Sequence, residues 1–496
     1  MVKKRGPLRA KTNTQKRGSS TTHVRHSLEH IQSLLTEVLS VTAPADVLTS
    51  RYFKTHTQLG LRERGLIAEA VFAVLRRKLE FEAFVELLST ERSVSPMGLR
   101  TSCTTVASEP KTRRAERSDE TVHGSTARSE HRATQYLDRV VGCTGSSVRS
   151  LAMLGLAATA GLAQVMPVAR PEEIAWLEKL RTFDRQKLSW SVRSNLPDWI
   201  RTTLEQRFQS NQLERLVQAL QEPAPLDLRV NRIKISREQL LNYLASHHPD
   251  WGAQPTPFSP DGIRLANKPA LSNTAWFAQG WAEVQDEGSQ LLAHLLAPRR
   301  GEMVVDFCAG AGGKTLALGA MMRNTGRLYA FDIVARRLAK LKPRLARSGL
   351  SNVHPVLIDS EQDSKLKRIM GKVDRVLVDA PCSGLGTLRR NPDLKWRQTP
   401  ESLAELVIKQ QAILKAAAKL LKPGGRLVYA TCSFMREENQ AIIENFLAAH
   451  PGFQRIPVQE ILAVTPIPLT MAEDFELWPH VHNTDGFYAA VLALSK

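Results

Sequence analysis

The chain has 496 residues and a formal net charge of +19 at pH 7. This length can hold about two to four domains, and the positive charge favours a polyanionic partner, most simply a nucleic acid, although a generically basic protein is the alternative. Five cysteines without paired spacing disfavour a disulfide framework, and a reducing, cytoplasmic location is predicted. The longest apolar run, 151–163, is too short to span a bilayer, and no apolar segment follows the basic start, so we expect neither a membrane anchor nor a signal peptide.

The N-terminal part combines a basic segment with a helical region. Residues 1–25 are rich in Lys and Arg without any acid, and we predict a disordered tail that either holds RNA electrostatically or is simply solvated. Residues 26–220 show helical spacing of apolar side chains, for example at Ile31, Leu34 and Leu35. A Ser-, Thr- and Arg-rich segment at about 93–132 breaks this periodicity and is predicted to be a mobile insertion.

A change of composition at 223–225 marks the start of a small α+β module, which we place at 221–290. Its predicted elements are a strand at 226–231, a helix at 238–246 and strands at 262–265 and 281–284. The module could lie against RNA, or it could be a structural linker domain.

The remainder, 291–496, alternates strands and helices without long gaps. The predicted strands are 304–307, 326–331, 353–358, 373–378, 426–430 and 486–492, and the predicted helices are 335–347, 400–420 and 436–449. Such alternation predicts an α/β, doubly wound, Rossmann-like sheet that binds its ligands at the carboxyl ends of its strands.

The stretch VVDFCAGAGGKT (304–315) has the strand–turn–helix pattern of a nucleotide-binding fold. A Walker A loop would need glycine at the position of Cys308, and a dinucleotide fingerprint would need glycine at the position of Thr315. S-adenosylmethionine requires only a turn that the ligand can approach closely and a carboxylate. It is therefore the favoured ligand over ATP, GTP or NAD.

Four acidic residues follow successive predicted strands at their carboxyl ends. They are Asp306, Asp332, Asp359 and Asp379. Each of them alone could be a helix cap, but in a parallel sheet all four would converge on one crevice. The carboxylate after the second strand, Asp332, is placed to accept the ribose hydroxyls of an adenosyl ligand.

Two cysteines belong to the same predicted crevice. Cys382 follows the fourth strand and Cys432 the fifth, and in the strand order 3-2-1-4-5 these strands are neighbours about 5 Å apart. Metal binding is disfavoured because no third soft or imidazole ligand is close in sequence, with His450 and His482 as the remaining candidates.

A thiol beside a methyl donor suggests pyrimidine methylation. Addition of a thiolate at C6 makes C5 of the ring nucleophilic, and an acid near N3 stabilises the developing charge. A basic neighbour such as Lys314 would help to form the thiolate, and the base must leave its stack to be reached. The residues alone do not rank the two thiols as nucleophiles.

Several motifs resemble the RNA cytosine-5 methyltransferases of the Sun/Nop2 type. They are DFCAGAGGKT, VDRVLVDAPCSGLGTLRRNPDLKW, LKPGGRLVYATCS, EENQ and TDGFYAAVL, with PLDLRVN and WAEVQDEGSQ ahead of them. LRERGLIAEAVFAVLRRK (61–78) and NLPDWI (195–200) are similar to the NusB-like domain of the bacterial ribosomal RNA small-subunit methyltransferase B branch. The family turn usually reads C-A-A-P-G-G-K, so Gly310 and Ala311 are departures from it.

The resemblance implies roles for individual residues. Cys432 would be the nucleophile that attacks C6, Cys382 would assist release of the methylated product, and Asp379 would contact the cytosine. The implied donor site consists of Cys308, Ala309, Gly310, Ala311, Gly312, Gly313, Lys314, Asp332, Asp359 and Asp379. No metal is expected.

The function implied is S-adenosylmethionine-dependent formation of 5-methylcytosine in small-subunit (16S) rRNA, catalysed by the domain at 291–496. A tRNA substrate, or a non-catalytic RNA-binding factor of ribosome assembly, are the alternatives. RNA is the expected partner, and the expected oligomeric state is a monomer.

Overall fold

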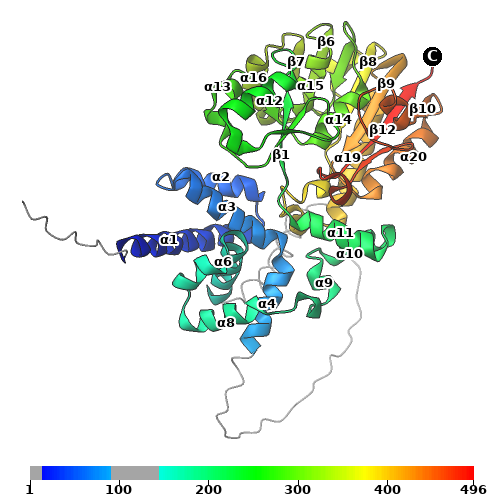
Figure 1. The fold of residues 1–496 in the computed structure, drawn as a ribbon. Coiled ribbons are helices and arrows are strands. Elements are labelled where there is room, and N and C mark those ends of the chain that lie inside the picture. Colours follow the sequence, from blue (N-terminus) through cyan, green and yellow to red (C-terminus); the bar gives the residue numbers. More distant parts are fainter. Residues whose placement is uncertain (1–13, 91–144) are drawn as a thin grey trace, which may run out of the picture. The chain divides into compact units, whose positions relative to one another are not determined.

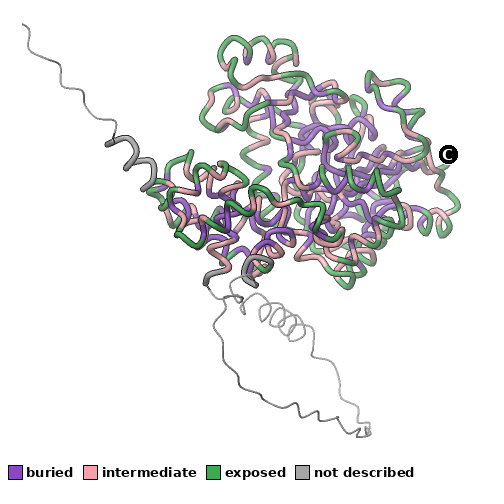
Figure 2. The backbone as a smooth tube through the Cα atoms, turned by 60° about the horizontal axis from the view of Figure 1, so that its bottom comes forward, coloured by how far each residue is buried: buried purple, intermediate pink, exposed green. Residues whose placement is uncertain are grey.

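The computed structural model describes residues 14–90 and 145–496. The chain forms two compact units, Met1–Asn195 and Leu196–Lys496, which are described separately below (Figure 1). In each unit, buried backbone segments form an interior beneath an exposed surface (Figure 2). Within the described residues, the helices lack the combination of length and apolar character that crossing a bilayer requires.

The first unit is helical. Its elements are α1 (Thr14–Leu39), α2 (Ala45–Thr55), α3 (Leu61–Arg76), α4 (Lys78–Thr90), α6 (Gly145–Ala160), α7 (Leu162–Val165), α8 (Pro171–Arg181) and α9 (Trp190–Arg193). The apolar stripe of α1, including Ile31, Leu34 and Leu35, is fully buried, as its spacing predicts. Helices α3 and α6 cross closely at Gly155, where a Cβ would lie only 2.4 Å from the carbonyl oxygen of Ala70.

Two predictions concern the basic tail and the insertion of the N-terminal half, parts of which lie outside the described residues. Helix α1 begins at Thr14, so the segment 14–25, which we predicted to be part of a disordered tail, is helical and continues without a break into the packed part of α1. Residues 1–13, and the predicted insertion at 93–132, lie outside the described residues.

The second unit begins with α10 (Asp198–Arg207) and α11 (Ser210–Gln221), two helices that the sequence-based boundaries place in the helical domain 26–220. Helix α11 packs against α22 (Pro479–His482). At the end of α10, Arg207 pairs with Glu476 at 2.8 Å and donates a hydrogen bond to the carbonyl of Phe434. These contacts join both helices to the C-terminal domain.

The small module is a four-stranded antiparallel sheet. The strand order is β2 (Gln254–Pro255), β3 (Gly262–Leu265), β1 (Leu226–Val230) and β4 (Ala282–Val284). Helices α12 (Arg237–His247) and α13 (Ala275–Ala278) complete it. Its core is built around Leu228, Leu240, Ile263 and Trp276.

The large sheet has eight strands. Seven of them lie in the order β10 (Phe453–Ile456), β12 (Phe487–Leu494), β9 (Leu421–Thr431), β8 (Val373–Asp379), β5 (Met303–Asp306), β6 (Arg327–Asp332) and β7 (Val353–Leu357), and β11 (Phe475–Leu477) pairs with β12. Strands β5 to β9 are parallel, whereas β12 is antiparallel to β9. The predicted order 3-2-1-4-5 is therefore confirmed as β7-β6-β5-β8-β9.

Helices cover both faces of this sheet, as a doubly wound fold requires. Consecutive residues of β5, Val304 and Val305, belong to two different cores. The first core includes α14 (Glu287–Leu296), α15 (Gly313–Met321), α16 (Ala335–Ser348) and α21 (Val458–Leu462). The second includes α17 (Ser364–Lys367), α19 (Pro400–Ala418) and α20 (Gln440–Ala449). The predicted helix 436–449 is interrupted, because Arg436–Glu438 forms a separate 3-10 turn and Asn439 leaves the helical conformation.

Candidate active site

The glycine-rich turn joins the end of β5 to the start of α15. Gly312 has φ +82°, and a Cβ there would lie 2.1 Å from the side chain of Leu341. Gly310 also has a positive φ, of +56°, but a Cβ there would meet no atom within 4 Å. Glycine is therefore required at 312 by packing and by the backbone, whereas at 310 it leaves open space beside the turn.

Asp332, at the end of β6, holds this turn in place. One carboxylate oxygen accepts the N–H of Gly310 at 2.8 Å and the other accepts the N–H of Val334 at 2.7 Å. The carboxylate that the sequence predicts after the second strand is thus fixed by the turn and by the start of the following loop.

Asp306 lies beneath the turn and is fully buried. It accepts a hydrogen bond from the hydroxyl of Thr315 at 2.7 Å. Burial raises the pKa of Asp306 to about 7, and the nearby Asp379 carboxylate acts in the same direction.

Asp379, at the end of β8, forms an ion pair with Lys314 from the first turn of α15. The Lys314 ammonium lies 2.6 Å from a carboxylate oxygen of Asp379. Burial alone lowers the pKa of Lys314, but the charge and hydrogen bond of Asp379 outweigh it, and the pKa is raised. Lys314 therefore places a cation beside Asp379 at the bottom of the crevice.

The two predicted cysteines meet. Cys382 and Cys432 follow the adjacent parallel strands β8 and β9, and their Sγ atoms lie 3.4 Å apart as free thiols. The hydrogen bond with Cys432, together with burial, raises the pKa of Cys382 well above its usual range. Burial similarly raises the pKa of Cys308.

A cavity of about 810 Å³ opens over these groups. The predicted residues that line it are Asp306, Cys308, Ala309, Gly310, Ala311, Gly313, Lys314, Asp332, Asp379, Cys382 and Cys432. It unites the predicted donor turn with both thiols in one space.

Two residues of the predicted donor site do not line this cavity. The side of Gly312 where a Cβ would stand faces Leu341. Asp359 is exposed, and its N–H donates to the side chain of Asp363. Glu361, two residues further along the same loop, lines the cavity instead. The candidate metal ligands His450 and His482 do not line it either.

Sequence reasoning missed several polar residues of the cavity wall. Arg337, Lys340 and Arg344 line it from α16 and are spaced to share one helix face. Lys409 contributes from α19, and Gln285 from the segment before α14. The spacing of the three basic residues on α16 could have been recognised in the sequence, whereas no local pattern indicates that Lys409 belongs to the cavity.

The small module is joined to the turn by buried and partly buried charges. Arg344 pairs with Glu283 of β4 at 2.9 Å and donates to the carbonyl of Ala311 at 2.7 Å. Arg229 of β1 donates to the carbonyl of Gly313 at 3.3 Å. The module thereby contacts the glycine turn directly at Gly313, and at Ala311 through Arg344 of α16.

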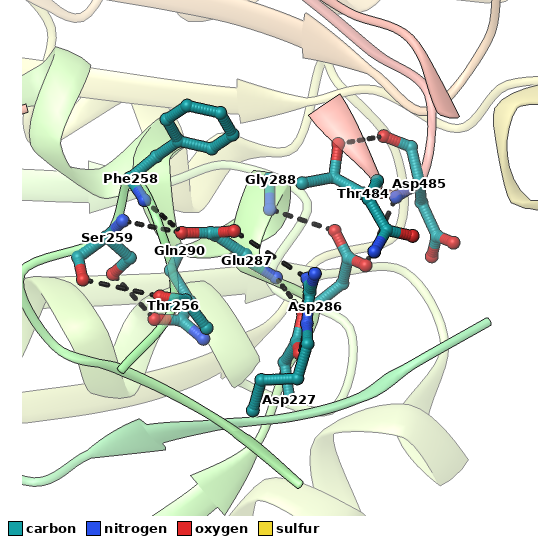
Figure 3. A network of polar contacts seen from close by, with 12 residues as sticks. Asp227, Thr256, Phe258, Ser259, Asp286, Glu287, Gly288, Gln290, Thr484 and Asp485 are labelled. Carbon is teal, nitrogen blue, oxygen red and sulfur yellow. Dashed lines mark hydrogen bonds and ion pairs between the residues drawn. The ribbon is translucent and has the colours of Figure 1, made fainter. Parts of the chain in front are cut away.

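A second network joins the module to the start of α14 and the chain's closing strand (Figure 3). Glu287 accepts the N–H groups of Phe258 and Ser259 at 2.6 and 2.7 Å. Asp286 accepts the N–H of Asp485 at 3.2 Å. Arg390, just beyond the Cys382 loop, pairs with both of these aspartates, at 2.8 Å to Asp286 and 2.6 Å to Asp485.

The sheet order, the glycine turn, the carboxylates at the strand ends and the cavity define a Rossmann-like methyltransferase domain. A family model described as 16S rRNA methyltransferase RsmB/F matches residues 293–493. A second, described as the ferredoxin-like domain of the RsmF/B-like methyltransferases, matches residues 196–272.

Curated relatives extend this result. The chain is 38% identical over 310 residues to the probable ribosomal RNA small subunit methyltransferase B of Synechocystis sp., covering 62% of this chain and 69% of the relative. It is 35% identical over 318 residues to ribosomal RNA small subunit methyltransferase B of Yersinia pseudotuberculosis, covering 63% and 71%. The crystal structure of PH0851 has a TM-score of 0.65 at 23% identity, covers 96% of this chain and 99% of that one, and shows that the fold is shared.

The chain belongs to the RsmB/F family of 16S rRNA methyltransferases. It is thus an enzyme of the rRNA cytosine-C5 methyltransferase family.

Proposed function

We propose that this protein transfers a methyl group from S-adenosylmethionine to C5 of a cytosine in small-subunit rRNA, through a covalent bond between a cysteine and C6. The observation that carries the proposal is the meeting of Cys382, Cys432 and the Lys314–Asp379 pair in the cavity beside the glycine turn. Family membership supports the RNA substrate, and the net charge of +19 suits a polyanion.

The residues of the turn fit S-adenosylmethionine. Gly310 leaves open the space that a Cβ would fill, and Asp332 supplies a carboxylate fixed by two backbone N–H groups. The wall from Cys308 to Lys314, apart from Gly312, faces the same cavity. Bound at this turn, the donor would supply the methyl group to the cavity that both thiols also line. Asp359 is exposed and does not line the cavity, so its role in donor binding stays a prediction from the sequence.

The chemistry at the base belongs to the chain's own side chains. The Cys432 thiolate forms a bond to C6 of the flipped cytosine, which turns C5 into a nucleophile. Asp379 contacts the ring and stabilises charge there, and Lys314 supplies a cation in the same space. After methylation a water molecule takes the C5 proton, the C5–C6 double bond re-forms, and the bond from C6 to sulfur breaks to return the Cys432 thiolate. Cys382, 3.4 Å from Cys432, is placed to assist this release.

The decisive experiment measures transfer of labelled methyl groups to purified small-subunit rRNA, with tRNA as the parallel substrate. We expect 5-methylcytosine in the rRNA and none from the Cys432→Ala variant. If only tRNA is labelled, tRNA and not rRNA is the substrate. The absence of 5-methylcytosine from every RNA tested would refute the proposal.

We further infer that the N-terminal helical region is a NusB-like RNA-binding domain and that the module at 221–290 also faces RNA. The module bonds directly to the donor turn through Arg229, and its Glu283 pairs with Arg344 of α16, which also contacts the turn; both contacts support a role close to the substrate. Ultraviolet crosslinking of the full chain to rRNA, followed by peptide mapping, tests this, and crosslinks confined to 291–496 would contradict it.

A further inference from the structure

Glu438 lies beneath the two cysteines. Its side chain is fully buried and accepts three hydrogen bonds. They come from the backbone N–H of Ser383 at 2.8 Å, the hydroxyl of Ser383 at 2.6 Å and the side-chain amide of Gln410 at 2.9 Å. Ser383 directly follows Cys382, so the carboxylate holds the loop that carries this thiol.

The same turn of chain also holds the other cysteine. Asn439 accepts the hydroxyl of Thr431 at 2.6 Å and donates to the carbonyl of Ser433 at 3.0 Å. These two residues flank Cys432. The hydroxyls of Ser383 and Ser433 lie 3.1 Å apart and join the two loops directly. The neighbouring pair Glu438–Asn439 therefore fixes the positions from which both thiols project.

The charges around the two thiols are not symmetric. The negative charge of Glu438 contributes to the raised pKa of Cys382, after the hydrogen bond with Cys432 and burial. Cys432, by contrast, interacts electrostatically with Lys314. Burial lowers the pKa of Lys314, Asp379 raises it, and Cys432 adds to this rise. The charge of Glu438 thus opposes a thiolate at Cys382, whereas the charge that interacts with Cys432 is the cation of Lys314.

We propose that Glu438 is a positioning residue that holds the Cys382 loop and directs the thiolate to Cys432 by keeping Cys382 protonated. The inference deepens the proposed function, because it supplies a physical reason for the assignment of Cys432 as the nucleophile. A role in packing alone would need the hydrogen bonds of Glu438 but not its charge.

The variant Glu438→Gln separates these two roles. Its amide oxygen can accept from the N–H of Ser383, and its amide nitrogen can donate to the Ser383 hydroxyl, so the shape is kept while the charge is lost. Glu444→Gln is the matched control, because Glu444 loses the same charge on the exposed side of the adjacent helix, where it pairs with Arg436.

The experiment alkylates the full-length protein with iodoacetamide, without RNA or donor, across a pH series under single-hit conditions. Peptide mass spectrometry gives a separate rate for each cysteine. In the wild type we expect Cys432 to react faster and Cys382 to need a higher pH. In Glu438→Gln we expect the rate at Cys382 relative to Cys432 to rise about tenfold, the effect of a shift of about one pKa unit. Glu444→Gln should match the wild type.

An unchanged ratio in Glu438→Gln would overturn the proposal. So would a wild-type protein in which Cys382 reacts as fast as Cys432 or faster, and this arm needs no variant to fold. Because the readout requires no methyl transfer, its failure is distinguishable from failure of the proposed enzymatic activity.

Discussion

The Sγ atoms of Cys382 and Cys432 lie 3.4 Å apart although the two residues are separated by 50 positions in the chain. Two thiols at hydrogen-bonding distance can divide one reaction between them, with one forming the bond to the base and the other assisting its rupture.

Substitution of each cysteine should give opposite results. We expect Cys382→Ala to accumulate a covalent protein–RNA adduct, because the bond from Cys432 to C6 forms but is released slowly. Cys432→Ala should form no adduct, because it lacks the proposed nucleophile. Denaturing gel electrophoresis after incubation with rRNA and methyl donor detects the adduct. The wild type, which should release the adduct, serves as the control. The reverse pattern would make Cys382 the nucleophile.

The Lys314–Asp379 pair should be required for the chemical step. Asp379→Asn removes the partner that keeps Lys314 charged, and a loss of roughly 10²–10³ in kcat is expected for a group that stabilises charge in the transition state. Burial lowers the pKa of Lys314 and Asp379 raises it, so the pKa of Lys314 should be lower in the variant. The loss of activity on the alkaline side of the pH–rate profile should therefore begin at a lower pH. A pH–rate profile measures both effects.

Glu473→Gln is the control for this variant, because Glu473 is largely exposed and pairs with Arg455. A kcat for Asp379→Asn within about twofold of the control would show that the ion pair only supports the local structure.

Replacement of Gly312 by alanine should mainly reduce stability, whereas replacement of Gly310 should mainly weaken donor binding. Gly312→Ala forces a methyl group against Leu341 at a positive φ, and we expect a loss of about 2–4 kcal/mol in the free energy of unfolding. Gly310→Ala meets no neighbour, so its cost should be about 1 kcal/mol, from the backbone alone.

The added methyl group at 310 should instead weaken binding of S-adenosylmethionine, because residue 310 lines the cavity. Thermal unfolding and titration calorimetry measure the two quantities. Equal destabilisation by both variants, with unchanged donor affinity, would contradict this division.

Asp306 should make the fold less stable as pH rises. Its folded-state pKa, about 7, lies above the usual value of 3.8. The folded state therefore binds the proton more tightly, and this contribution is fully present below pH 4 and lost as the pH rises through about 7. Relative to the wild type, Asp306→Asn should gain stability progressively between about pH 4 and 7, by at most about 4 kcal/mol.

Denaturant titrations at several pH values test this prediction. Thr315 provides the reference, because Thr315→Val removes the hydroxyl that donates to Asp306 and should strengthen the pH dependence. A pH-independent difference between Asp306→Asn and the wild type would show that Asp306 is ionised in the folded protein throughout this range.

The sequence by itself determined the strands, the strand order and the crevice. The apolar runs around Val304 and the glycine turn are local signals, and the order of parallel strands places Asp332, Asp379 and both cysteines at one edge because connections in such sheets follow few topologies. Only the tertiary structure decided which of these side chains meet. Asp359 does not line the cavity, whereas Glu361, two residues further along the loop, does. The position of a loop side chain depends on its contacts and not only on its place after a strand.

Tertiary contacts also decided the groups that hold the site. Glu438 lies in a segment that reads as an ordinary helix start, and its burial follows only from the packing of the two cysteine loops around it. Arg390 pairs with Asp286 and Asp485, residues about a hundred positions away on either side. Hydrogen bonds of this kind join segments that are distant in sequence and leave no local periodicity, which is why a single chain read in order identifies the thiols but not the carboxylate that positions them.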